Sequence, residues 1–456
     1  MKEDEKLLQS KSDGLSRRDF LKAGLAGVAA AGMAEFTVEA LAANPKNIAP
    51  LDLKPEKGAA LKVLRWVQFV EGDKIFWERN TKKWEELTGS KVLTEYISWE
   101  DVRPKAAMTA AIGAGHDIII GWHDDPHLYP NALLDVTDLA NYLGEKYGGW
   151  EPVCEMYGVH QKTKRWICLP LGAVTMCMNY RLSWMKEVGF DEFPDKIPDF
   201  LMLCKKLKAK GHPTGFSVGH AVGDANSNWH WWLWGFGGKV VEKDGLTLCL
   251  NKQETWDALE ASKEFYETMI PGVASWLDPH NNKAFLAGEV SVTGNGISIY
   301  YVAKEKFPEV AADMGHAKMP IGPVGRSTEL HNHNEAFIFR HCKYPEAAKH
   351  YLIHMFEEPQ YRQWIEGMKA LVAPSLKYYK KLPVWTVDPM HTPYRDTLSR
   401  ALWNGYAGPE GPAAAATIAD YVVVDMFADV LIRGKSPKAA AAAAQDRAAR
   451  YYKRLY

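Results

Sequence analysis

The strongest constraint on the fold is a regular alternation of strand and helix patterns at the start of the folded region. Alternating apolar runs at 61–69 and 92–97 predict strands, and the continuous β-branched run at 117–120 predicts a buried strand. Between them, apolar residues at helical spacing predict helices over 76–87 and 102–112. Strands and helices that alternate at this pace are typical of parallel βαβ units, so the chain is predicted to be an α/β protein.

The same patterns continue toward the C-terminus, with a growing share of helix. Further strands are expected at 166–180, 214–218, 290–293 and 336–339. Further helices are expected at 133–143, 181–188, 198–210, 253–270 and 282–286. From Tyr344 the chain is expected to be helical nearly to its end, with breaks at Pro374, 383–393 and 408–412.

The first 42 residues have the layout of an export signal. Residues 16–22 read Ser-Arg-Arg-Asp-Phe-Leu-Lys and precede an Ala/Gly-rich run at 23–34, and small residues at 40–42 suit cleavage. This order predicts a twin-arginine signal peptide over 1–42 and a periplasmic protein that starts near Ala43. A basic N-cap on an ordinary amphipathic helix is the alternative interpretation. Residues 43–60 follow, hold three prolines and no periodicity, and are expected to be a linker.

Composition describes a soluble globular protein. The chain after the signal has about 410 residues, too many for one hydrophobic core and suited to two lobes. The sequence is 47% hydrophobic and 24% charged with a net charge of −1, which excludes an electrostatic footprint for nucleic acid or an anionic membrane. Its 6 cysteines occur singly, so a disulfide scaffold is excluded although one or two bridges stay open. Its 17 Trp, 20 Tyr and 16 Phe suit both a core and the stacking faces of a sugar site.

Five stretches of the sequence carry a resemblance to one family. They are Trp84-Glu-Glu-Leu-Thr-Gly89 before Val92, the run from Ile112 to Asp124, Leu169-Pro170 through Asn179-Tyr180 to Gly189, the run from Ala284 to Asn295, and the run from Leu431 to Ala440. In this order and spacing the chain resembles the extracellular solute-binding proteins of carbohydrate ABC importers (family 1), the group that includes maltose-binding protein. It departs from the family in the reversed order of Asn179 and Tyr180.

The resemblance implies a periplasmic-binding-protein-like fold, with two α/β lobes joined by a hinge and about three crossovers. The implied N-terminal lobe spans 61–174 plus 335–373, and the implied C-terminal lobe spans 175–334 plus 374–456. A ligand would bind in the cleft, and the lobes would close on it by hinge motion. The implied function is capture of a sugar, oligosaccharide or polyol and its delivery to the ABC permease. That function needs no catalysis, no cofactor and no metal, and a monomer suffices.

A strand end at 122–124 provides the first candidate contacts. Sugars need carboxylates and amides for their hydroxyls and aromatic rings for their C–H faces. Trp122, His123 and Asp124 directly follow a buried strand, and the resemblance gives Asp124 the role of hydroxyl acceptor. A solvated loop with an aspartate N-cap is the alternative. His123 and His127 together lack the third ligand that a metal site needs.

The end of the first strand and an aromatic cluster provide further candidates. Gln68, Phe69 and Asp73 follow the first strand, where the family contacts its ligand, although Asp73 alternatively caps the next helix. Trp229 and Trp232 share one face of a predicted helix, and Trp231 and Trp234 lie on another. One face is expected in the core, and the other face or the preceding loop at 224–228 is expected to line the cleft, with an all-core cluster as the alternative.

Two later stretches complete the predicted site. Asn295, Ser298 and Tyr300 follow a strand where the family often places a stacking aromatic residue, and Ser298 or Tyr300 would substitute for the family's tryptophan. Glu329 and His331 belong to a polar stretch before the last strand and are expected at a hinge, with a structural role as the alternative.

A secreted carbohydrate-active enzyme, exported in folded form, is the alternative function. No G-x-G-x-x-G follows the first strand, and H-E-x-x-H does not occur. The 56 acidic residues do not discriminate between a binding protein and an enzyme, because a chain with so many carboxylates always offers pairs for glycoside hydrolysis. A binding subunit for a sensor kinase is a third possibility. The candidate loops hold no Arg/Lys cluster, which favours a neutral ligand. Because Arg65 and Lys74 lie near these loops in sequence, a sugar phosphate stays an alternative ligand.

Overall fold

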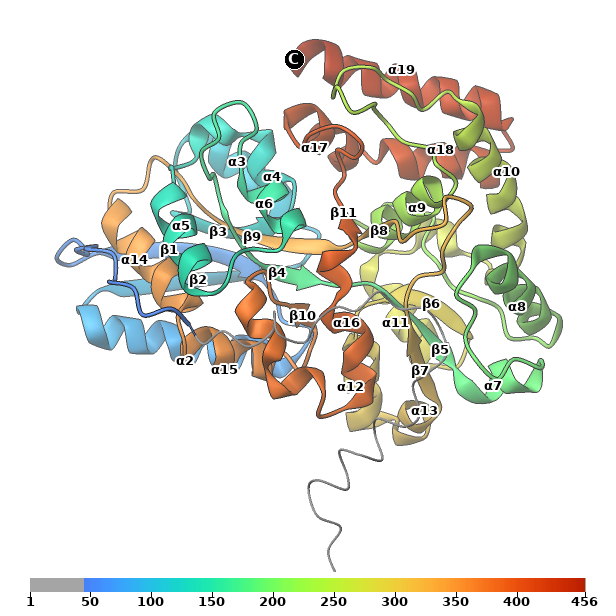
Figure 1. The fold of residues 1–456 in the computed structure, drawn as a ribbon, viewed down its shortest axis with the longest axis horizontal. Helices are drawn as coiled ribbons and strands as arrows, with labels where there is room; N and C mark the ends of the chain where they lie inside the picture. The colour runs from blue at the N-terminus through green and yellow to red at the C-terminus, as the bar shows by residue number, and fades with distance from the viewer. Residues whose placement is uncertain (1–44, 456) are drawn as a thin grey trace, which may run out of the picture. The chain divides into compact units, whose positions relative to one another are not determined.

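Two β-sheets organise the computed structural model, which describes residues 45–455 (Figure 1). The larger sheet contains β1 (Ala60–Trp66), β2 (Lys91–Ile97), β3 (Ile118–Trp122), β4 (Leu169–Val174), β9 (Asn332–Ile338) and β10 (Val372–Ala373). Its strand order is β10-β4-β9-β3-β1-β2. β1 pairs in parallel with β2 and β3, as the βαβ pattern predicts, whereas β9 runs antiparallel to β3 and β4. The predicted export signal lies outside the described residues.

Helices lie on both faces of the larger sheet, and sheet and helices together are called the first lobe (Figure 1). The helices are α2 (Glu71–Thr88), α3 (Val102–Ile112), α4 (Asp125–Leu128), α5 (Thr137–Lys146), α6 (Pro152–Gly158), α14 (Pro345–Phe356) and α15 (Gln360–Gly367). Helix α2 buries Trp77, Thr81 and Trp84 at helical spacing against the core. It ends at Gly89, whose φ of 71° is the left-handed conformation that glycine adopts without strain.

The smaller sheet and its helices are called the second lobe. The sheet contains β5 (Cys177–Arg181), β6 (Val292–Asn295) and β7 (Met314–Ala317), with β5 in the middle and antiparallel to both neighbours. The helices are α7 (Leu182–Glu187), α8 (Ile197–Ala209), α9 (Asp224–Gly235), α10 (Gln253–Glu267), α11 (Asp278–Leu286), α12 (Ser298–Lys306) and α13 (Pro308–Ala312). Every residue of α9 is buried, which explains a helix that is apolar and aromatic on more than one face.

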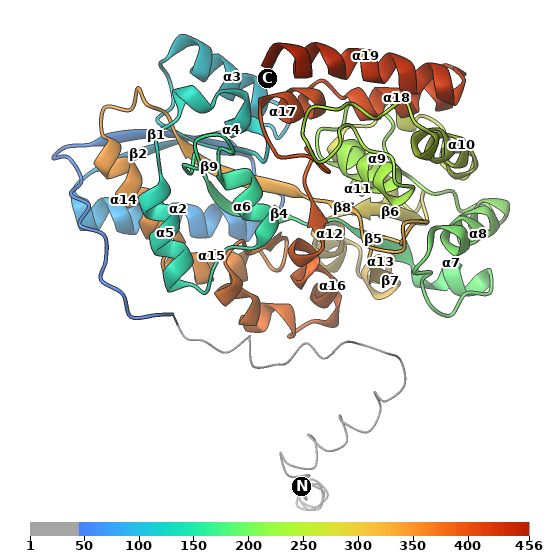
Figure 2. The same cartoon turned by 45° about the horizontal axis from the view of Figure 1, so that its top comes forward.

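The C-terminal part is mostly helical and joins the second lobe (Figure 2). It contains α16 (Thr392–Arg395), α17 (Pro412–Ala419), α18 (Val422–Leu431) and α19 (Pro437–Leu455). Helices α18 and α19 pack on α10, and α17 also contacts α4 of the first lobe. Two short strands, β8 (Glu329–Leu330) and β11 (Ala401–Leu402), pair in parallel beside α9. Short 3-10 helices lie at Pro130–Ala132, Val273–Ser275, Lys377–Lys381, Pro383–Trp385, Pro389–His391 and Thr397–Ser399.

The chain passes from one sheet to the other by short connections. β4 continues into β5, and β8 continues into β9 (Figure 1). A third passage follows β10, after which Ser375 still donates a hydrogen bond to Pro170 O of the first lobe, at 2.6 Å. Because neighbouring residues of one segment then belong to different lobes, side chains next to these connections meet both lobes.

The strand predicted at 214–218 does not form. Thr214 makes an isolated bridge to Met269, and the backbone N–H of Gly215 donates to Val292 O. Because the segment takes its hydrogen-bond partners from separate parts of the chain, no continuous ladder develops. The side chains of this segment are buried, but the segment pairs with no neighbouring strand.

Residues 45–59 have neither helix nor strand, but they contact the first lobe along their length. Leu53 packs against the hydrophobic core. The carboxylate of Glu56 accepts hydrogen bonds from the backbone N–H groups of Glu346 and Ala347, at 3.1 and 2.8 Å. The predicted linker is therefore bound to the start of α14 in the first lobe. Across residues 45–455, no helix has both the length and the apolar character that a bilayer crossing requires.

A buried ion pair joins β1 to α2 in the first lobe. Arg65 Nη2 donates to Asp73 Oδ1 at 2.6 Å, and both side chains are 0% exposed. Trp364 Nε1 donates to the same oxygen at 2.8 Å. The Arg65 guanidinium also lies over the Trp77 ring, 4.3 Å from its centroid. Asp73 therefore has a structural role at the base of α2.

Replacing Asp73 by Ala is expected to lower the free energy of unfolding by about 3–5 kcal/mol, because Arg65 would keep a buried charge without its partner. Urea-induced unfolding measures this loss. The control is Glu78→Ala on the same helix, where Glu78 pairs with Lys74 at the surface, and there we expect about 1 kcal/mol or less. Equal losses for the two variants would contradict the structural role of Asp73.

Candidate ligand-binding site between the lobes

A small cavity lies where the two lobes meet. It encloses about 30 Å³, room for a water molecule or two. Its lining residues are Phe69, Trp99 and Val174 from the first lobe, Asp224, Asp278, Asn282, Asn295 and Ser298 from the second lobe, and Met176, Leu371 and Asn332 next to the connections. Because ends of strands and helices supply these side chains, the sheet edges of both lobes define the cavity.

Aromatic rings form the first-lobe wall of the cavity. Trp99 follows β2, and its ring contacts Phe69, Trp66 and Trp122 with centroid separations of 5.3, 5.1 and 4.4 Å. All three contacts are edge-to-face, which holds the Trp99 ring in one orientation. The cavity therefore has a fixed flat surface that suits the C–H face of a ring or carbon chain.

A carboxylate pair lies in the second-lobe wall. Asp278 begins α11 and accepts hydrogen bonds from the backbone N–H of Gly223, at 3.1 Å, and of Asp224, at 2.9 Å. Burial raises the pKa of Asp278 to about 6, although these backbone hydrogen bonds act in the opposite direction. Burial, and then the neighbouring charge of Asp278, raise the pKa of Asp224 well above its usual range.

Amide side chains connect the carboxylate pair to the end of β6. Asn281 Nδ2 donates to Asp224 Oδ2 at 2.5 Å, and Asn295 Nδ2 donates to Asn281 Oδ1 at 3.0 Å. Asn282 Nδ2 donates to Ser298 Oγ at 3.0 Å, and Asn282 Oδ1 accepts from Asn295. These mutual hydrogen bonds hold the polar wall in place before any ligand arrives.

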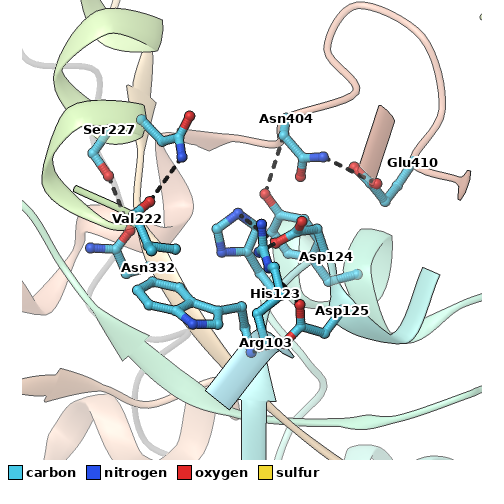
Figure 3. Close-up of polar contacts among 12 residues, drawn as sticks. Arg103, His123, Asp124, Asp125, Val222, Ser227, Asn332, Asn404 and Glu410 are labelled. Carbon is cyan, nitrogen blue, oxygen red and sulfur yellow. Dashed lines mark hydrogen bonds and ion pairs between the residues drawn. The ribbon is translucent and has the colours of Figure 1, made fainter. Parts of the chain in front are cut away.

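A second polar cluster lies farther along the interface and contains His123, Asp124, Asn404 and Glu410 (Figure 3), together with His333 beside His123. His123 and His333 face each other with ring centroids 6.4 Å apart. Among the described residues, neither ring nitrogen of His123 has a hydrogen-bond partner, and His333 Nε2, Asp124 Oδ2 and Asn404 Oδ1 also have none. Buried polar atoms without partners are rare in folded proteins, and those of this cluster are free to form hydrogen bonds with another molecule.

The charges in this cluster are set by burial. Burial lowers the pKa of His123 and of His333 well below 6.5, so both rings are neutral at neutral pH. Burial also raises the pKa of Asp124, which the nearby Arg103 guanidinium partly offsets. Arg103 binds Asp124 and also donates from Nε to Asp125 Oδ1 at 2.8 Å. Burial, and then the charge of Asp124, raise the pKa of Glu410 to about 8.

Trp122 and Asn332 connect the cavity to the second cluster. Trp122 contacts Trp99 on one side and His123 on the other. Asn332 lines the cavity, and its Oδ1 accepts from Ser227 Oγ at 3.1 Å (Figure 3). The cavity and the cluster are therefore adjoining parts of one interface between the lobes.

Six of the predicted ligand contacts lie at this interface. Phe69, Asn295 and Ser298 line the cavity. The other three, Trp122, His123 and Asp124, lie beside it or in the second cluster. The structure therefore brings together residues that are up to 229 positions apart, from Phe69 to Ser298.

Four other predicted residues do not line the cavity. Asp73 is occupied by Arg65, and Gln68 is half-buried beyond the end of β1. Trp229 and Trp232 lie inside the second lobe, where Trp229 stacks on Phe427 and Trp232 stacks on Phe265. Their indole N–H groups donate to the backbone oxygens of Ser217 and Ala258, both at 2.9 Å.

The remaining three predicted residues are held by protein partners. Tyr300 on α12 donates its hydroxyl to Asp388 Oδ2 at 2.9 Å. Glu329 accepts from Arg400 at 3.2 Å and contacts His331 at 3.1 Å. His331 Nδ1 accepts from the backbone N–H of Met176 at 3.1 Å, so it links two connections between the lobes. Their ligand contacts stay predictions that the cavity lining does not support.

Sequence reasoning missed Trp99, Asp278, Asn404 and Glu410. Trp99 directly follows a predicted strand, so the same strand-end signal that indicated Phe69 and Trp122 was present. Asp278 stands before a proline at a helix start, which indicates only a capping residue. Asn404 and Glu410 lie in irregular chain, where no local pattern indicates a site. Over residues 45–455, no three His, Cys, Asp or Glu side chains are placed to hold a metal ion.

Comparison with protein families gives two matches. A model of bacterial extracellular solute-binding proteins matches residues 81–393, which is more than half of the chain. A model of twin-arginine translocation signal sequences matches residues 14–34. The second match confirms the predicted export signal and indicates a periplasmic location. A search of curated proteins gave no match.

Solved structures with the same fold include sugar-binding proteins. The GacH receptor of Streptomyces glaucescens, solved without ligand and with acarbose, has 16% sequence identity and a TM-score of 0.72, covering 88% of this chain and 100% of its own. Maltose-bound MalE3 of T. maritima has 16% identity and a TM-score of 0.73, covering 86% and 99%. An ABC transporter solute-binding protein of Agrobacterium radiobacter, in complex with ribitol, has 17% identity and a TM-score of 0.69, covering 87% and 100%. At these identities the likeness confirms the two-lobe fold.

Stability should depend on the protonation of Glu410. The unfolded chain releases this proton near pH 4.5 and the folded protein holds it to about pH 8, so the free energy of unfolding should fall as pH rises between these values. The expected slope from this residue is at most about 1.4 kcal/mol per pH unit. Glu410→Gln should remove that share of the slope in urea unfolding measured across the window, whereas exposed Glu254→Gln should leave it. Unchanged slope in Glu410→Gln would refute a buried, protonated Glu410.

Proposed function

Because the chain belongs to the bacterial extracellular solute-binding proteins, we propose that it captures a sugar, oligosaccharide or polyol between its lobes and delivers it to an ABC permease. The observation that carries the proposal is the interlobe interface, where fixed aromatic rings face carboxylates and amides. Rings cover C–H faces and the polar groups bind hydroxyls, so one surface meets both parts of a polyhydroxylated molecule. Sugar and polyol complexes of proteins with the same fold support this ligand class.

The two lobes would close on the ligand by a hinge motion. We assign 61–174 and 335–381 to the first lobe, and 175–334 and 382–456 to the second. The last passage is placed after residue 381, and not at the predicted 374, because Lys377 and Lys380 still contact Gly149 and Glu151 of the first lobe. The cavity of about 30 Å³ is too small for a sugar, so the lobes have to open to admit one. Bending at the connections between the sheets would open the interface, and closing it would surround the ligand.

The ligand contacts we propose combine predicted and newly found residues. Trp99, Phe69 and Trp122 would cover apolar faces, and Asn295, Ser298, Asp224 and Asp278 would bind hydroxyls at the cavity. At the second cluster, His123 would bind hydroxyls through its ring nitrogens and Asp124 through Oδ2, the atoms that have no hydrogen-bond partner in the described chain.

The proposal includes binding without bond cleavage, by a monomer, with no cofactor and no nucleic-acid partner. A purified protein incubated with a ligand that raises its melting temperature should return that ligand unchanged in mass spectrometry. Consistent conversion of the ligand would favour a secreted enzyme instead. A panel of sugars and polyols in which none raises the melting temperature would refute the proposed ligand class.

Replacing Trp99 by Leu should weaken ligand binding at least about tenfold, since the flat ring that faces the cavity is lost. Isothermal titration calorimetry with a ligand that raises the melting temperature measures the effect. The matched control is Trp256→Leu, because Trp256 lies on α10 away from the interface and pairs with Asn251. A Trp99→Leu protein that is folded and binds like the control would show that the cavity is not the binding site.

A further inference from the structure

The cavity between the lobes carries acidic groups without a basic partner. Its lining includes Asp224 and Asp278 but no lysine, arginine or histidine. Among the ion pairs of residues 45–455, none includes either carboxylate. The second cluster differs, since there Arg103 pairs with Asp124 and Asp125. The Asp224–Asp278 pair therefore supplies the acidic groups of the cavity, and no basic side chain in the lining favours their ionised form.

The two carboxylates of this pair have different surroundings. Both oxygens of Asp278 accept backbone hydrogen bonds, from Gly223 and Asp224. Asp224 is 6% exposed, lines the cavity, and accepts from Asn281 through Oδ2. Within the described chain, no hydrogen bond reaches Asp224 Oδ1. One oxygen of a nearly buried carboxylate is therefore left for a molecule in the cavity, and leaving it unpaired is costly.

The aromatic wall adds a second, independent feature. Trp99 and Phe69 line the same cavity, and no described lysine or arginine lies over either ring, although such contacts occur at Trp66 and Trp77. Ring faces attract cations through their quadrupole, most strongly for tryptophan. A cation in the cavity would thus meet a carboxylate oxygen on one side and unoccupied aromatic surface on the other.

We propose that the ligand is an amino sugar or amino polyol, whose ammonium group binds Asp224 Oδ1 beside Trp99 and whose hydroxyls extend toward His123 and Asp124. This inference rests on the proposed function and narrows its ligand class. A neutral sugar would give the ionised form of the Asp224–Asp278 pair no counter-charge, and a sugar phosphate would add charge of the same sign. An ammonium group supplies the counter-charge and a charge-assisted hydrogen bond together.

The test compares ligands that differ at one group. Glucose, glucosamine and N-acetylglucosamine form one set, the corresponding galactose compounds a second set, and sorbitol with 1-amino-1-deoxysorbitol a third. Isothermal titration calorimetry on the protein without its signal peptide measures each affinity. In at least one set the amine should bind about tenfold more tightly than its neutral parent, and N-acetylation should remove the gain.

A variant pair assigns the effect to Asp224. Asp224→Asn keeps an oxygen for Asn281 and removes the charge, so the amine and its neutral parent should then bind about equally. Asp257→Asn, at an exposed position of α10, should keep the preference of the unmodified protein.

The outcomes separate the two proposals. Neutral parents that bind as tightly as the amines in every set would overturn the cationic ligand and leave sugar binding intact. A preference for putrescine over every amino sugar would overturn both, because a hydroxyl-free amine does not need the second cluster. If no compound of any set binds, the amino-sugar ligand is overturned, whereas sugar binding is decided by the wider panel of sugars and polyols. A preference for amines that persists in folded Asp224→Asn would overturn the role of Asp224.

Discussion

Strand β9 is the constraint on which the rest of the structure depends. It pairs with β3 and β4 in the middle of the larger sheet and directly continues β8 of the other side. All of its residues are buried, although its first four are Asn332, His333, Asn334 and Glu335. The sheet satisfies their backbone groups, while the side chains of Asn332 and His333 meet the interface between the lobes. One strand thus holds the larger sheet together, forms one connection between the lobes and supplies side chains to the candidate site.

Burial of polar groups at the interface links the fold to its function. Histidine, carboxylate and amide atoms lie between the lobes without protein partners, most clearly at His123. Each such atom costs free energy when the lobes close, unless another molecule supplies the hydrogen bond. A ligand with many hydroxyls would remove that cost, so closure and capture become one event. The same reasoning explains why burial shifts the pKa of so many groups here.

Local patterns predicted the first lobe well because its helices and strands follow each other in sequence and in space. The helix over 102–112 has the predicted bounds, and α2 and β2 differ from prediction only at their ends. The segment 214–218 was predicted as a strand, but its hydrogen-bond partners come from distant parts of the chain, and no ladder forms. Strand-end reasoning indicated Phe69 and Trp122, and applied once more it would have indicated Trp99.

The sequence by itself determined the export signal, the α/β class and the kinds of side chain available for a ligand. These follow from short-range order, which a chain carries without being folded. Only the tertiary structure decided which polar residues meet. It paired Asp73 with Arg65 and packed Trp229 into the core of the second lobe. It also placed Asp224, Asp278 and Trp99 around one cavity. The physical reason is that the site forms between two lobes, where neighbours are set by packing and hinge geometry over hundreds of residues.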